Sequence, residues 1–205
     1  MSLVPKSEIA RRLNSDLADQ IYIDPVLSES QIGEISVDLR LGCDFQVSVQ
    51  TRKPSITLSK GADFRDPAMF FQESRRDLGE SFVLYPSQTV LATTLEYVGL
   101  PSDLYADIVT RSSYNRLGVT LSSMFQPGFR GCISLELFNH SNTPVELIVG
   151  SRIVQARFHK ISEGAQYIVP GDARKYLGQV RPTTSRAAED KDLQILSKIQ
   201  ANRVK

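Results

Sequence analysis

Apolar and polar residues alternate along much of the chain, which is the pattern of strands with one buried face. Between residues 35 and 49, Val37, Leu39 and Leu41 alternate with polar neighbours, so we predict a strand there. Turn residues then separate short β-rich runs at intervals of roughly ten residues, the spacing of a sandwich or barrel. These further strands are predicted at 82–85, 89–97, 105–110, 118–121, 132–138, 145–149 and 152–158.

Apolar residues occur at helical spacing near both ends of the chain. Ser7 has the side chain of a helix N-cap, and Ile9 and Leu13 behind it would share one face of a short helix. Apolar residues at 193, 196 and 199 predict an amphipathic helix within 187–204. The segment 51–79 is polar and irregular, so we expect a long surface excursion there.

Strands and helices do not alternate, which disfavours a doubly wound sheet and favours a mainly β fold, a distorted jelly roll. We expect residues 1–170 to form this β domain, with the N-terminal helix included. Residues 171–205 are polar and basic, and would form a tail and a terminal helix.

Composition narrows the possible functions. The net charge of +1 argues against bulk nucleic-acid binding, which needs concentrated positive charge. No apolar run approaches a membrane span and no secretory h-region opens the chain, so a cytoplasmic protein without membrane contact is expected. Cys43 and Cys132 stand far apart, and the histidines are His140 and His159, so a zinc-deaminase ligand set is missing.

Two hydroxyls between two guanidiniums make the segment 111–118 a candidate anion site. Arg111, Ser112, Ser113 and Arg116 could bind a phosphate chain together with open backbone amides. An N-capped helical turn with solvated arginines fits the same residues equally well.

Glu136 is the candidate acid/base. In a strand it would share a face with Ser134 and Phe138, between apolar neighbours, so its carboxylate should need a partner, and we expect an arginine. A sheet glutamate facing solvent is the alternative. In the basic tail, Lys175 and Gln179 are candidate phosphate ligands, and a solvated tail is the alternative there.

Taken together, these segments resemble the dCTP deaminases of the trimeric dUTPase superfamily. The resemblance runs from about residue 23 to 186, and four ordered pieces at family-like positions make it specific. The pieces are 37–42, 111–118, 127–136 and 175–179, followed by Pro182, Ser185 and Arg186.

The resemblance implies a β-clip, dUTPase-like barrel, a homotrimer with active sites between subunits, and Mg²⁺ carried by the triphosphate rather than held by protein ligands. It implies dCTP and dUTP as ligands, with dTTP as a candidate feedback ligand. It makes Glu136 catalytic, with Ser112 and Arg116 beside it. The implied substrate contacts are Arg111, Ser113, Gln126, Ser134, Leu135, Tyr167, Lys175 and Gln179.

Two departures bear on sugar recognition. The family usually has an aspartate where this chain has Gln126, and the loop 119–125 is about three residues shorter than usual. The expected reaction is hydrolytic deamination of dCTP to dUTP and ammonia, without zinc. Alternatives are a bifunctional enzyme that forms dUMP, for which Asp38 is the candidate acid, a dUTPase, and a nucleotide-binding protein without turnover.

Overall fold

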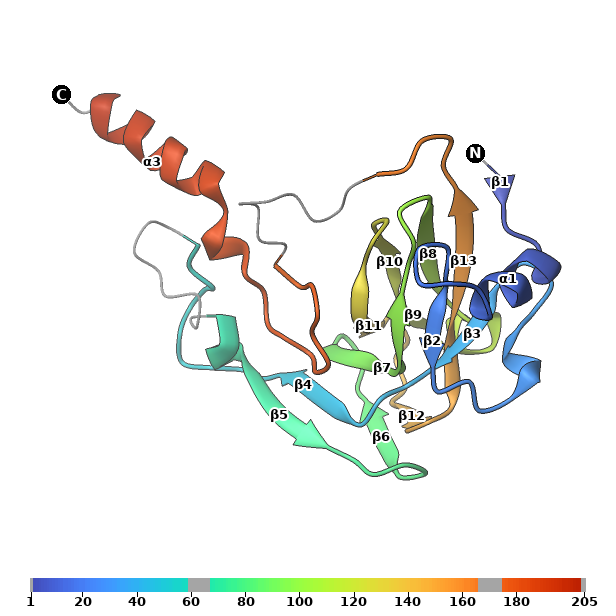
Figure 1. Cartoon of the computed structure of the whole chain (residues 1–205). Coiled ribbons are helices and arrows are strands. Elements are labelled where there is room, and N and C mark those ends of the chain that lie inside the picture. Colours follow the sequence, from blue (N-terminus) through green and yellow to red (C-terminus); the bar gives the residue numbers. More distant parts are fainter. Residues whose placement is uncertain (1, 59–66, 166–174, 204–205) are drawn as a thin grey trace.

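Antiparallel strands build two large sheets and a third, two-stranded one (Figure 1). The computed structural model describes residues 2–58, 67–165 and 175–203. Within these ranges the sheets pack around a common core without closing into a barrel, and the mainly β prediction is confirmed.

The first sheet is organised around β13, which pairs with β1 and β3 along one edge and with β8 along the other. β10 pairs with β8 at the border of the sheet. The strands are β1 (Ser2–Leu3), β3 (Val37–Arg40), β8 (Leu104–Thr110), β10 (Ser122–Phe125) and β13 (Arg152–Lys160).

The second sheet is organised around β7 and β11, which pair along most of their lengths. β4 and β2 lie on the other side of β7, β5 lies outside β4, and β9 lies outside β11. The strands are β2 (Tyr22–Asp24), β4 (Asp44–Ser48), β5 (Phe71–Arg75), β7 (Thr89–Gly99), β9 (Val119–Thr120) and β11 (Arg130–Asn139). The two-stranded sheet consists of β6 (Ser81–Leu84) and β12 (Val145–Ile148).

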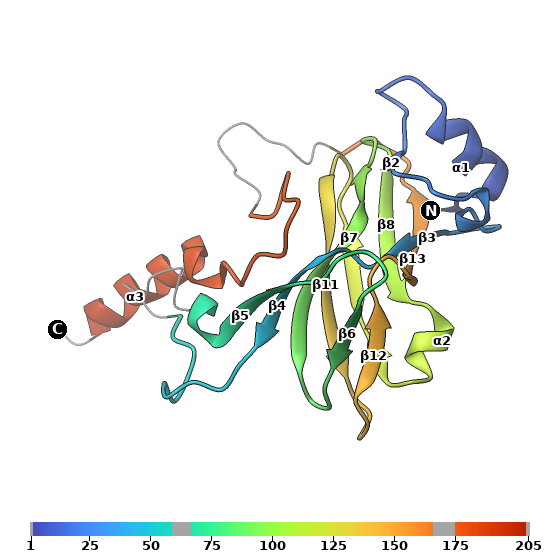
Figure 2. The ribbon, with the colours of Figure 1, turned by 90° about the horizontal axis from the view of Figure 1, so that it is seen from below.

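Helices are short and lie outside the sheets. They are α1 (Lys6–Leu13), η1 (Glu29–Gln31), η2 (Pro67–Phe70), α2 (Ser112–Asn115), η3 (Ala187–Glu189) and α3 (Lys191–Arg203). Helix α1 buries Ile9 as predicted, but its N-cap is Pro5, two residues before Ser7. Helix α3 projects from the body at the end opposite α1 (Figures 1 and 2). No helix in the described ranges is long and apolar enough to cross a membrane.

The core contains side chains from all three sheets. On β11 the alternation of apolar and polar residues determines which side chains enter it. Ile133, Leu135 and Leu137 are fully buried, whereas Ser134 and Glu136 face the opposite side of the strand. Each successive side chain of a strand points to the opposite face, so the alternation read from the sequence places Glu136 outside the core. This part of the prediction is confirmed.

Several element boundaries differ from the prediction. The strand expected over 35–49 is two strands, β3 and β4, because the chain turns at Gly42 to pass close to β7. The irregular segment 51–79 contains β5, and the short strands β1, β2 and β10 were not predicted. The domain boundary expected at residue 170 lies outside the described residues.

Candidate functional site

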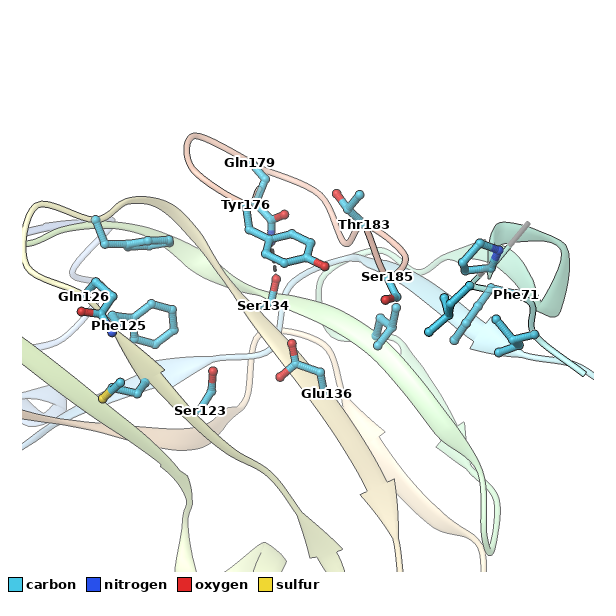
Figure 3. Close-up of a pocket in the computed structure, with 16 residues that line it drawn as sticks. Phe71, Ser123, Phe125, Gln126, Ser134, Glu136, Tyr176, Gln179, Thr183 and Ser185 are labelled. Carbon is cyan, nitrogen blue, oxygen red and sulfur yellow. Dashed lines mark hydrogen bonds between the residues drawn. The ribbon is translucent and has the colours of Figure 1, made fainter. Parts of the chain in front are cut away.

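A pocket of about 620 Å³ lies over the outward face of β11, and Glu136 is the only carboxylate among the described residues that line it. Figure 3 shows Ser134 and Glu136 rising from β11 into this space, with Phe125 and Gln126 on one side and Phe71 on the other. The pocket therefore brings together Glu136, Ser134, Gln126 and Gln179, four of the residues singled out from the sequence.

The Glu136 carboxylate touches solvent, yet protein atoms crowd it and reduce its hydration. This burial raises the pKa of Glu136 above its ordinary range. The arginine partner expected from the sequence is absent: the described residues include no ion pair to Glu136. A carboxylate with a raised pKa and no ion-pair partner among the described residues is suited to accept and return protons.

Apolar side chains form the remaining walls. Phe125 and Phe129 pack together at 4.8 Å between ring centroids at one end. Ile56, Leu58 and Phe71 line the other end, and Ile56 and Leu58 remain 48% and 40% exposed, so this part of the 51–79 segment lies at the surface and also borders the pocket. Such walls exclude water from a flat ring and leave hydrogen bonding to the few polar groups.

The tail crosses above β11 and closes part of the pocket (Figure 3). The Cys132 amide donates to the Gln179 carbonyl at 2.8 Å, and the Gln179 side-chain amide donates to the Ser134 hydroxyl. Gly131 makes this approach possible, because a Cβ there would lie 2.9 Å from the Gln179 oxygen. The tail is thus fitted to β11 by main-chain as well as side-chain contacts.

Tyr176 also lines the pocket, and its hydroxyl accepts the Arg186 amide at 3.1 Å. It was not predicted as a site residue, although its place beside Lys175 in the family-like piece was a usable signal. Tyr167, the tyrosine chosen from the sequence, lies outside the described residues. Leu135 is fully buried, so only its main chain can face a ligand.

Lys175 does not line the pocket. Its ammonium is paired with the Asp190 carboxylate, just before α3. Arg186 is paired with Glu189 at 2.7 Å. Lys175 and Arg186 are therefore held by the acidic segment that follows the tail, whereas Arg181, between them, lies 3.8 Å from Asp44 on β4.

The second candidate cluster lies apart from the first. Ser112, Ser113 and Arg116 are exposed on and after α2, and none of them lines the pocket of the same chain. Figure 2 shows α2 at the edge of the molecule away from the tail and α3. The helical turn of the alternative interpretation is present, although no side chain caps it. The side chains expected beside Glu136 are not brought to it within one chain.

Asp38 and Arg111 meet behind α2. The Arg111 Nε lies 3.3 Å from Asp38 Oδ2, Arg152 Nη1 lies 3.6 Å from the same oxygen, and Gln155 donates to Oδ1 at 3.0 Å. Asp38 is 8% exposed. The one acid considered for phosphate chemistry thus lies against the arginine considered for phosphate binding.

These residues suit a metal ion delivered by a phosphate chain. In the described ranges no three acidic, histidine or cysteine side chains gather as a metal cage would require. Mg²⁺ commonly binds through substrate phosphates, waters and one or two carboxylates.

Comparison with known proteins gives a consistent result. A family model described as dCTP deaminase-like matches residues 3–161. A protein of Methanobrevibacter smithii named "dCTP deaminase, dUMP-forming" is 40% identical over 179 residues, which cover 85% of this chain and 91% of that protein. A protein of Natronomonas pharaonis named "dCTP deaminase" is 35% identical over 195 residues, covering 93% and 97%.

A similar fold is found in the crystal structure of 2′-deoxycytidine 5′-triphosphate deaminase from Agrobacterium tumefaciens, with a TM-score of 0.57 and 23% identity. The match covers 76% of this chain and 47% of that one, so this chain spans about half its length. This likeness supports the arrangement of the strands.

Proposed function

Because the chain belongs to the dCTP deaminase-like family, we propose that it converts dCTP to dUMP by deaminating the cytosine and then releasing pyrophosphate. The observation that carries the deamination is the position of Glu136, which lines a pocket of about 620 Å³, has a raised pKa and has no ion-pair partner among the described residues. The name of the Methanobrevibacter relative supports dUMP as the product.

Deamination replaces the 4-amino group of cytosine with oxygen. A water molecule attacks C4, a proton is placed on N3, a second proton reaches the departing nitrogen, and ammonia leaves. Glu136 takes one proton from the attacking water and passes it to N3. It then takes the remaining proton from the new C4 hydroxyl and passes it to the amino group, so that C4=O forms as the C4–N bond breaks and ammonia leaves. Burial shifts the pKa of Glu136 toward neutral pH, where one carboxyl group can both accept and donate a proton.

The polar groups around Glu136 would position the substrate. Ser134 and Gln179 offer a hydroxyl and an amide at the edge of the ring, and the Leu135 main chain lies between Ser134 and Glu136. Gln126, at the other end of the pocket, would meet the sugar. A neutral amide binds a hydroxyl less strongly than the aspartate that the family usually has there.

We infer that a second copy of the chain completes the site. Ser112 and Arg116 are exposed on α2 and do not reach the Glu136 of their own chain. In a homotrimer, a head-to-tail interface can place the α2 of one subunit against the pocket of the next. The Arg116 guanidinium and the Ser112 hydroxyl would then hold the attacking water beside Glu136.

Asp38 is the candidate for the second step. It lies 3.3 Å from Arg111, which with Ser113 would bind the triphosphate. Asp38 would orient a water molecule for attack on the α-phosphorus, the bond to the bridging oxygen breaks, and pyrophosphate leaves. Mg²⁺ bound to the phosphates would neutralise the charge of the leaving group.

Release of dUTP as the final product is the second candidate, favoured by the name of the Natronomonas relative. Two variants separate the steps. Asp38→Asn should still release ammonia from dCTP but accumulate dUTP, whereas Glu136→Gln should release no ammonia. Asp44→Asn, which breaks another Asp–Arg pair, serves as the control. If Asp38→Asn forms dUMP at the wild-type rate, Asp38 has no part in the second step.

A further inference from the structure

The pairing of β7 with β11 is interrupted immediately before the site. Cys132 faces Tyr97 and Ser134 faces Thr93, so three residues of β7, Thr94 to Glu96, stand opposite Ile133 alone. Such a bulge leaves a main-chain group without its usual ladder partner and redirects the strand. The interruption lies three residues before Glu136.

A single hydroxyl closes this gap. The Ile133 amide donates to Thr94 Oγ1 at 2.9 Å, and Thr94 Oγ1 donates to the Glu96 carbonyl at 2.7 Å. Thr94 is 2% exposed, so water cannot take over either bond. The threonine side chain therefore replaces one rung of the ladder and fixes the bulge at the same time.

Buried hydrogen bonds to Thr93 and Glu96, on either side of Thr94 in β7, hold the bulge in place. The Glu96 carboxylate is 0% exposed and accepts the Arg40 amide at 2.8 Å and the Gln31 amide at 3.1 Å. Gly42 donates its amide to the Thr93 carbonyl at 2.8 Å, and its lack of a Cβ lets the chain pass there. The position of Thr94 is thus set by several neighbouring segments.

The tail binds the same stretch of β11 along the edge opposite to β7. The Cys132 amide binds the Gln179 carbonyl, and the Ser134 hydroxyl binds the Gln179 side chain. Ile133 lies between these two contacts and is tied to Thr94 on the opposite side. A shift of Ile133 would consequently move the tail, Ser134 and Glu136 together.

We propose that Thr94 is a positioning residue for the reaction: its hydroxyl fixes the main chain at Ile133 and thereby the placement of Ser134 and Glu136 against the cytosine. The inference rests on the proposed function, because it concerns the geometry of that site. A displacement of about 1 Å at a reacting group can cost roughly 100-fold in rate.

The test compares Thr94→Val, which keeps the shape and loses the hydroxyl, with Thr94→Ser, which keeps the hydroxyl. Ammonia release from dCTP should show kcat reduced between about 10- and 100-fold in Thr94→Val, with a smaller change in KM, and near the wild-type value in Thr94→Ser. Thr93→Val, the same change one residue earlier on β7, is the matched control and should retain kcat.

Thermal unfolding separates positioning from stability alone. If Thr94→Val unfolds at a lower temperature but keeps kcat in the folded protein, the inference is wrong and the proposed function stands. If Thr94→Val does not fold, Thr94→Ala takes its place, and failure of both to fold makes Thr94 a folding residue only. A wild-type protein that releases no ammonia overturns the proposed function and this inference together.

Discussion

At the scale of residues, Glu136 combines a solvent contact with a desolvated carboxyl group. Burial removes water from the carboxyl group and so favours its uncharged acid form, which raises the pKa of Glu136. The folded protein then holds a proton at pH values where the unfolded chain has lost it. Charging Glu136 costs stability in the folded state, a cost that the proposed catalytic role of Glu136 would require.

This cost gives a prediction for Glu136→Gln. As pH rises from the ordinary glutamate pKa through the raised one, the wild type should lose stability that the variant keeps, because the amide never charges. Thermal unfolding should therefore show the variant more stable near neutral pH, with the difference disappearing at acidic pH. Glu146→Gln on β12 controls for the loss of a strand glutamate, and equal stability of Glu136→Gln and wild type across the pH range would contradict the assignment.

At the scale of elements, the sequence predicted the strands whose alternation is long enough to be read. The runs around β7, β8, β11 and β13 are confirmed, because each has one face in the core. The two- to four-residue strands β1, β2 and β10 were missed, since they hold too few residues to show a period. The bulge at Thr94 was missed because it depends on the pairing of two strands distant in sequence.

The site was predictable to a similar degree. Glu136, Ser134, Gln126 and Gln179 do line one pocket. Within one chain no described arginine pairs with Glu136, and the family-like spacing gives only the order of residues along the chain, not the copy of the chain that supplies each side chain. The pairing of Lys175 with Asp190 also could not be read from the sequence, since it depends on how the tail folds back.

The docking of the tail on β11 gives a prediction for Gly131→Ala. Gly131 has φ +150°, and a Cβ there would meet the Gln179 oxygen at 2.9 Å, so the tail must move away. Losing one or two hydrogen bonds should raise the KM for dCTP by about 5- to 10-fold. Gly79→Ala, also at positive φ but with nothing within 4 Å of its Cβ, is the control in the same steady-state assay. An unchanged KM in Gly131→Ala would separate the tail from substrate binding.

At the scale of the whole molecule, the proposed function divides the site between two separated surfaces of one chain. The pocket on β11 holds Glu136, the proposed acid/base, and the surface around α2 holds the cations and hydroxyls that would bind phosphate. Symmetric assembly would bring together halves that the fold keeps apart. Oligomerisation is in this account a condition for catalysis.

Subunit mixing tests this assembly. Glu136→Gln and Arg116→Ala should each be inactive alone. Trimers formed after unfolding and refolding an equal mixture should regain about a quarter of the wild-type sites, because one intact half can come from each parent. Ammonia release before and after mixing is the measurement, and no recovery from properly refolded trimers would mean that both residues act within one chain.

The stoichiometry of products from dCTP tests the central claim most directly. Wild-type protein with Mg²⁺ and dCTP should release ammonia and pyrophosphate in equal amounts and leave dUMP, with both products appearing at the same rate. Ammonia release with dUTP as the stable product would contradict the second step assigned to Asp38, and pyrophosphate release without ammonia would contradict the role assigned to Glu136.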